Sequence, residues 1–286
     1  MAASSFASSK SAGVRGPVVT GFVAAMPEEM APLRSRVTDA RRIGAGNGME
    51  LVAGRLYGAS VVLAVTGDGE RNARAGIAAM LAATPLDRLI AVGVAGALSG
   101  DLVAGALVAS ERVVTEDGAQ TFCADGPLCA RAIRDGGARA GLIVTAGRII
   151  DTVADKQRLL AAARAQVQAP AGALAVVVVD LESAAYAAAA TRAALPFVIV
   201  RAVSDTADEA LPALLNRCRD VGGAVRRGRV AFELLGNPGA LPVLLSLRQR
   251  VRFCADALAR AAEAMVLAAS STSENARVAQ SLTGAV

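Results

Sequence analysis

The feature that most limits the fold of this chain is a pair of continuous apolar segments with an alanine-rich segment between them. Residues 174–180 read LAVVVVD and residues 196–205 read PFVIVRAVSD, while residues 182–195 read ESAAYAAAATRAAL. Segments that are apolar along their whole length, rather than at alternate positions, are typical of strands in parallel sheets with both faces covered. The order strand, helix, strand therefore predicts an α/β fold.

The same alternation continues along the rest of the chain. It predicts further strands at 17–26, 87–98, 105–117 and 141–150, a hairpin at 49–67 turning near Gly58, and helices at 27–37, 70–84, 151–167 and within 210–269. Residues 115–139 show no regular pattern, and Gly236-Asn237-Pro238-Gly239 interrupts the last helices. We expect one domain over residues 17–269, between disordered tails at 1–16 and 270–286. Its expected architecture is a three-layer α/β/α fold with a mixed, largely parallel central sheet and a C-terminal helical extension.

The composition excludes several kinds of chemistry. The 286 residues include no histidine, and the four cysteines have no spacing typical of metal ligands. We therefore expect no metal site and no mechanism that depends on histidine. Acid–base chemistry must then come from Asp, Glu, Lys, Tyr or Cys side chains.

The charge and hydropathy patterns limit the partners and the location. The net charge is +5, and almost all of the positive charge comes from arginine, since the lysines are only Lys10 and Lys156. Aromatic residues make up 3% of the chain. With so few stacking side chains, we expect no nucleic-acid partner. No apolar run reaches about 18 residues and the N-terminus lacks the apolar core of a signal peptide, so we expect a cytoplasmic protein with reduced thiols.

Two carboxylates follow the two apolar segments. Glu182 comes just after the first strand and Asp205 ends the second, and a right-handed crossover between parallel strands would bring both to one edge of the sheet. Glu182 could accept hydrogen bonds from a vicinal diol such as ribose, and Asp205 could protonate a ring nitrogen. Alternatively, Glu182 caps its own helix and Asp205 forms an Asx turn with Thr206.

A glycine-containing turn lies between a strand and a helix at residues 65–73, VTGDGERNA. Backbone N–H groups at a helix N-terminus can bind an anion, so Gly67 and Arg71 are the candidates for holding phosphate, should phosphate be a co-substrate. The spacing matches neither a dinucleotide-binding nor an ATP-binding loop. A tight turn with no ligand is the alternative.

The segment VVDLESAAYAAAATRAALPFVIVRAVSDTADE resembles the signature region of the nucleoside phosphorylase/nucleosidase superfamily. In the same order, TGFVAAMPEEM resembles the first strand of methylthioadenosine/S-adenosylhomocysteine nucleosidases, and the resemblance covers about Val18 to Asp208. GRVAFELLGNPGALPVLLSLRQRV and TAGRIIDTVADKQRLL are similar to the hopanoid-associated phosphorylase branch, the adenosylhopane nucleosidases.

The resemblance implies roles for particular residues. Asp205, kept protonated in a poorly solvated pocket, would donate to purine N7, with Ser204 orienting it. Glu182 would hold the ribose hydroxyls, and Glu29 would activate water. Arg201 would orient that end of the site or pair with Glu29. Asp180 would only hold the turn, and the remaining implied substrate contacts are Leu181, Ile149, Ile150, Val94, Ala95 and Gly96.

Several positions depart from the family pattern. Val94 replaces a Ser or Thr, which weakens the case for phosphorolysis, and Ile149 replaces the aromatic residue that stacks on the purine. Leu181 replaces a Met, and the absence of histidine suits an apolar 5′ substituent. Whether water or inorganic phosphate attacks stays open, and no other cofactor is expected.

The resemblance therefore implies an enzyme that cleaves a small-molecule or lipid-linked adenine nucleoside, adenosylhopane being the specific expectation. Methylthioadenosine/S-adenosylhomocysteine nucleosidase or another purine nucleoside phosphorylase is the first alternative, and a non-catalytic nucleoside-binding protein is the second. We also expect a homodimer. The basic C-terminal segment with Arg248, Arg250 and Arg252 either packs on the sheet or a partner subunit, which we favour, or contacts an anionic inner membrane.

Overall fold

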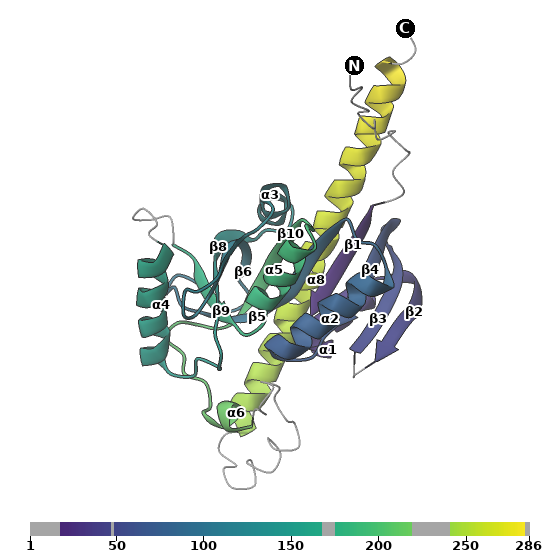
Figure 1. Cartoon of the computed structure of the whole chain (residues 1–286). Coiled ribbons are helices and arrows are strands. Elements are labelled where there is room, and N and C mark those ends of the chain that lie inside the picture. The colour runs from purple at the N-terminus through teal and green to yellow at the C-terminus, as the bar shows by residue number, and fades with distance from the viewer. Residues whose placement is uncertain (1–17, 47–48, 168–174, 219–240, 284–286) are drawn as a thin grey trace, which may run out of the picture.

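The computed structural model describes residues 18–46, 49–167, 175–218 and 241–283, with side chains as far as residue 268 (Figure 1). The predicted N-terminal tail and the break at 236–239 lie outside these residues. The described strands form one mixed sheet, and they are β1 (Val19–Ala24), β2 (Thr38–Gly46), β3 (Met49–Leu56), β4 (Ala59–Val65), β5 (Arg88–Ala97), β6 (Leu107–Thr115), β7 (Thr121–Cys123), β8 (Arg139–Thr145), β9 (Val177–Asp180) and β10 (Phe197–Asp205).

Strand β5 lies at the centre of this sheet. It pairs in parallel with β1 and β10, and at its carboxyl end with β9 in the antiparallel direction. Because β10 also pairs with β6, β6 with β8, and β8 with β9, these five strands close into a ring. Every residue of β9 and β10 is buried, as their continuous apolar sequences predict.

Helices cover the sheet on both faces, which confirms the three-layer α/β/α prediction. Helices α2 (Glu70–Ala83) and α5 (Ser183–Arg192) share one apolar core with the sheet. Helices α1 (Pro27–Arg34), α3 (Gly126–Arg134) and α8 (Leu241–Thr283) share a second core on the other face, and α4 (Val153–Val167) covers β8 and β9. The alanines of α5 are all buried, so this helix packs closely on the strands.

Helix α8 is long and crosses the molecule (Figure 1). Between Cys254 and Val266 it buries an apolar side against α1 and β10, which is the packing that the sequence analysis favours for this segment. Its first turns approach the short helix α6 (Leu214–Arg217). The helix continues to Thr283, beyond residue 269 where a tail is predicted. None of the described helices has the length and apolar content that a membrane crossing requires.

Two local predictions can be compared directly with the structure. The hairpin is confirmed, since β3 and β4 pair up to Leu56 and Ala59 and the turn places Tyr57 and Gly58 at positive φ. The expectation that residues 115–139 are irregular is wrong, because they contain β7 and α3. Asp125 is the N-cap residue of α3, and its side chain accepts a hydrogen bond from the Leu128 N–H. Aspartate is a preferred N-cap residue, so the sequence already contained a signal for the start of this helix.

Candidate active site

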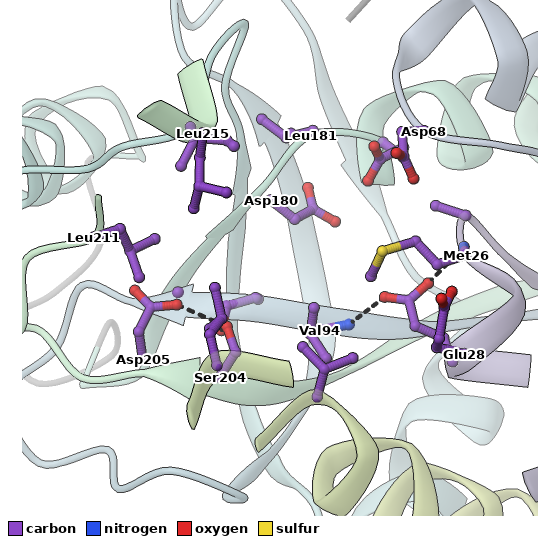
Figure 2. A pocket seen from close by; sticks show the side chains of 18 of the residues that line it. Met26, Glu28, Asp68, Val94, Asp180, Leu181, Ser204, Asp205, Leu211 and Leu215 are labelled. Atoms are coloured by element: carbon purple, nitrogen blue, oxygen red, sulfur yellow. Dashed lines mark hydrogen bonds between the residues drawn. The ribbon is translucent and has the colours of Figure 1, made fainter. Parts of the chain in front are cut away.

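A pocket of about 830 Å³ lies at the carboxyl end of β5, where β9 and β10 both meet it. Figure 2 shows Asp205 and Leu211 on one side of it, Met26 and Asp68 on the opposite side, and Asp180 between them. Its lining includes Ala25, Met26, Glu28, Glu29, Gly67, Asp68, Asn72, Val94, Ala95, Gly96, Arg148, Ile149, Ile150, Asp180, Leu181, Glu182, Ser204, Asp205, Leu211, Leu215, Leu244, Leu247, Arg248 and Val251.

Glu29 is held in the first turn of α1 by two backbone donors. Its Oε2 accepts a hydrogen bond from the Met26 N–H at 2.9 Å, and its Oε1 accepts one from the Val94 N–H at 2.8 Å. The side chain is buried, with 4% of the residue exposed. Burial raises the pKa of Glu29, while the nearby Arg201 and the two N–H donors act in the opposite direction. A raised pKa gives this carboxyl group a greater affinity for a proton than an ordinary glutamate has, which suits a general base.

Glu182 occupies the N-cap position of α5. Its Oε1 accepts a hydrogen bond from the Gly69 N–H at 2.8 Å. Burial, together with the negative charge of Asp180, raises the pKa of Glu182 to about 8. Gly67 and Gly69 have φ of 86° and 88°, a region that favours glycine, so the turn at residues 65–73 presents a backbone donor to Glu182.

Asp205 ends β10, and both of its oxygens receive hydrogen bonds. Ser204 Oγ donates to Asp205 Oδ1 at 2.7 Å. Lys156 Nζ, from α4, donates to Asp205 Oδ2 at 2.6 Å. Instead of the protonated and isolated acid that the resemblance implies, the structure has a buried ion pair. Lys156 was not among the predicted site residues, although the rarity of lysine in this chain already set it apart.

Arg201 lies in β10 behind the pocket wall and does not line the pocket. Its Nη2 is 2.5 Å from Asp180 Oδ2, and Nε and Nη2 also donate to Ser183 Oγ. The ion pair of Arg201 is thus with Asp180, while its charge also acts on Glu29. Asp180 also accepts hydrogen bonds from the Ser183 N–H and from Thr145 Oγ1.

The structure brings most of the predicted residues together. Glu29, Glu182 and Asp205 line one pocket, as do Leu181, Ser204, Ile149, Ile150, Val94, Ala95, Gly96 and Gly67. Arg71 does not, because it is exposed on α2 outside the lining. The lining residues that sequence reasoning missed include Glu28, Asp68 and Asn72, and the leucines of α6 and α8.

The pocket lining is predominantly acidic. It contains six carboxyl groups, those of Glu28, Glu29, Asp68, Asp180, Glu182 and Asp205, and its arginines are Arg148 and Arg248. Arg148 lies 3.0 Å from Asp155, which offsets its charge. Such a lining suits a ligand or transition state that carries positive charge. Among the described residues, no cluster of three potential metal ligands is found.

The fold and pocket together define an α/β protein with its site at the carboxyl edge of the sheet, the usual position for enzymes of this class. The family model of the Phosphorylase superfamily matches residues 20–227, and the chain belongs to that superfamily.

Named relatives and solved structures agree with this membership. A 5′-methylthioadenosine/S-adenosylhomocysteine nucleosidase of Marinomonas sp. (strain MWYL1) is 29% identical over 215 residues, which are 68% of this chain and 88% of the relative. The same type of nucleosidase from Neisseria meningitidis has a similar fold, with a TM-score of 0.65, 23% identity, and coverage of 87% of this chain and 98% of that one. Futalosine hydrolase of Helicobacter pylori has a TM-score of 0.65 and 18% identity, with 87% and 97% coverage.

Proposed function

We propose that this chain cleaves the N-glycosidic bond between adenine and ribose in an adenine nucleoside. The observation that carries the proposal is the convergence of three buried carboxyl groups, those of Glu29, Glu182 and Asp205, on one pocket. Carboxyl groups are costly to bury, and binding a neutral nucleoside alone would not require all three. The relatedness to a 5′-methylthioadenosine/S-adenosylhomocysteine nucleosidase supports the same class of bond.

Each carboxyl group has a position that suits one part of the reaction. Glu182, which keeps a proton at neutral pH because its pKa is raised to about 8, forms hydrogen bonds with the ribose 2′- and 3′-hydroxyls. As the C1′–N9 bond breaks, adenine takes the bonding electrons, and N7 accepts a proton from Asp205. Glu29 accepts a proton from the water that attacks C1′. The backbone donors to Glu29 and Glu182 fix both groups before substrate binds.

We infer that the nucleophile is water and not phosphate. The ionised carboxylates of the lining repel a phosphate dianion, and Arg71, the cation predicted to hold it, lies outside the pocket. Relatives often carry a hydroxyl residue at the position of Val94. The valine side chain has no polar group that could contact a phosphate. Adenine release that does not depend on added phosphate would agree with hydrolysis, and release that requires phosphate would contradict it.

We propose that the 5′ position carries a bulky apolar group, with adenosylhopane as the specific substrate. The support is an apolar wall contributed by α6, α8 and the segment before α6, which consists of Leu211, Leu215, Leu244, Leu247 and Val251. The pocket is at the large end of the range of about 300–1,000 Å³ that is typical of small-molecule sites, so it has room beyond the nucleoside itself. Methylthioadenosine and S-adenosylhomocysteine remain the alternative substrates, favoured by the Marinomonas relative.

A series of adenine nucleosides with 5′-alkyl chains of increasing length tests the apolar wall. Each buried methylene contributes about 0.8 kcal/mol, so kcat/KM should rise about fourfold per methylene until the wall is covered. Leu247→Ser should remove much of this gain. Leu267→Ser is the matched control, since Leu267 lies on the same helix but is exposed and outside the pocket lining. An unchanged chain-length dependence in Leu247→Ser would exclude this wall as the 5′ site.

We also propose that the start of α8 contacts an anionic inner-membrane surface. Leu241, Val243 and Leu245 are exposed there, within three positions of the pocket-lining Leu244, and Arg248 follows one turn later. Exposed apolar and basic side chains beside an apolar pocket suit a lipid-linked substrate. Sedimentation with anionic vesicles should capture the wild type and lose the triple serine variant of these three apolar residues. Equal capture of both would contradict the contact.

The homodimer stays a prediction, which light scattering would test.

The decisive assay for the activity measures adenine release from adenosylhopane, methylthioadenosine and S-adenosylhomocysteine, with and without phosphate. Release from at least one substrate is expected, and no release from any of the three would refute the enzymatic proposal in favour of nucleoside binding. Asp205→Asn should lose most of the turnover and keep ligand affinity. Full turnover in this variant would remove Asp205 from the reaction.

A further inference from the structure

A buried lysine lies directly behind the carboxyl group that the proposed reaction requires as an acid. Only 1% of Lys156 is exposed, and its Nζ donates to Asp205 Oδ2 at 2.6 Å, to the Thr206 carbonyl at 2.6 Å and to the Glu209 carbonyl at 2.9 Å. An ammonium group has three protons to donate, so these acceptors use all of them. Lys156 does not line the pocket, and it reaches the site only through Asp205.

The charge of this pair creates a chemical problem for the reaction. Lys156 on Oδ2 and Ser204 on Oδ1 both donate to Asp205, and both therefore stabilise the ionised carboxylate. A carboxylate has no proton to give to the departing adenine. Asp205 receives one of its hydrogen bonds from a charged donor, the ammonium group of Lys156. A proton of this ammonium group is therefore available next to the carboxylate.

We propose that Lys156 supplies, through Asp205, the proton that adenine takes up when the glycosidic bond breaks. This inference rests on the proposed function. As the C1′–N9 bond breaks, one proton moves from Nζ to the Asp205 carboxylate and one moves from that carboxyl group to N7. Lys156 becomes a neutral amine, water adds its hydroxyl to C1′ and its proton to Glu29, and Asp205 ends as it began. After adenine leaves, Glu29 releases its proton to solvent and Lys156 takes one up.

Carboxylate groups surround the ammonium group of Lys156. Asp205 faces it from β10, and Asp208 and Glu209 come from the segment after β10, where the positive charge of Lys156 contributes to lowering the pKa of both acids. Arg250 of α8 pairs with Glu209, at 2.5 Å, and acts electrostatically on Asp205. The positive charge of Lys156 therefore lies among carboxylates, and the pair that it forms with Asp205 holds one proton between two basic groups.

The test compares the pH dependence of adenine release in the wild type and in Lys156→Met. Without the lysine, the proton has no second group to bind, so Asp205 alone must hold it and gives it up to solvent as the pH rises. The wild-type to variant ratio of kcat/KM should therefore rise with pH, by at least tenfold between pH 5.5 and pH 8.5. Glu29 and Glu182 titrate in both proteins, so their effects cancel in the ratio. A ratio that does not change with pH would overturn the proposal.

Two controls separate proton supply from a structural role. Lys156 also connects the segment after β10 to α4 through the Glu209 carbonyl. Arg250→Met removes the other contact of Glu209, its ion pair with Arg250. This variant should lower Tm without the pH-dependent loss of kcat/KM. In an Asp205→Asn background, Lys156→Met should cause no further loss, because Lys156 acts only through Asp205. A further loss there, or a wild-type pH profile in Lys156→Met, contradicts the inference. If Lys156→Met does not fold, Lys156→Gln, which keeps two N–H donors, takes its place. Wild-type protein that releases no adenine would instead refute the proposed function.

Discussion

Replacing Glu182 by glutamine should change how the stability of the folded protein depends on pH. Burial and the charge of Asp180 raise the pKa of Glu182 from 4.5 to about 8. The folded state therefore keeps a proton on Glu182 in a pH range where the unfolded chain has lost it. Glutamine has nearly the same shape, can accept the same Gly69 hydrogen bond, and has no proton to lose.

The sign and size of the effect follow from linkage. Between the unfolded pKa of 4.5 and the folded pKa of about 8, the folded state binds the extra proton, so raising the pH lowers the free energy of unfolding by about 1.4 kcal/mol per pH unit. Below this window both states are protonated and above it both are ionised, so the contribution to the slope vanishes at each end. Between pH 5 and pH 7.5 the contribution amounts to about 3 kcal/mol.

Thermal unfolding followed by circular dichroism from pH 5 to pH 8 measures this contribution. In a domain of this size, 1 kcal/mol shifts Tm by about 2–4 °C, so the Tm difference between Glu182→Gln and wild type should grow by about 3–5 °C per pH unit. Glu70→Gln is the matched control, because Glu70 is exposed on α2 and its replacement should leave the wild-type slope unchanged. Parallel Tm curves for wild type and Glu182→Gln would refute the assignment of a raised pKa to this group.

Three further predictions concern the residues around the pocket. Arg201→Met leaves the buried Asp180 carboxylate without its ion-pair partner and should cost about 3–5 kcal/mol in chemical denaturation; a cost below 1 kcal/mol would contradict the pairing. Gly93→Ala would place a Cβ 2.0 Å from Arg201 Nη1, so adenine release should fall at least tenfold, whereas Gly100→Ala, with no atom within 4 Å, should be silent. Tyr186→Phe removes the 2.8 Å hydrogen bond to Thr66 and should cost about 1 kcal/mol.

The sequence predicted that Glu182 and Asp205 would meet, but for a reason that the structure corrects. The prediction took β9 and β10 as parallel strands of one sheet, joined by a right-handed crossover. Instead, both strands pair with β5, β10 in the parallel and β9 in the antiparallel direction, so that Val179 and Asp205 are both partners of Gly96. The apolar patterns identify buried strands, but they contain no information on which strands pair, because a fully buried strand is apolar in either direction.

The contacts that the sequence could not supply are those between distant segments. Glu29 was assigned from its resemblance, yet its position depends on the Val94 N–H, 65 residues away. The turn at residues 65–73 was considered as a phosphate site, whereas in the structure its Gly69 N–H serves Glu182, 113 residues away. A turn that offers backbone donors has the same local sequence whether an external anion or an internal carboxylate accepts from it, so only the tertiary structure separates the two.

The same reasoning explains how three carboxyl groups of one pocket can perform different tasks. Glu29 is buried and accepts two backbone N–H groups, Glu182 is buried beside a second carboxylate, and Asp205 is paired with an ammonium group. Under the proposed function, these surroundings would separate a base, a group that binds hydroxyls, and an acid that depends on a proton stored behind it, because the environment and not the residue type sets the affinity for protons. The chain has no histidine, and Lys156 is the single lysine of the described residues. Among basic side chains, lysine is better suited than arginine to store that proton, because an ammonium group loses a proton more readily than a guanidinium group does.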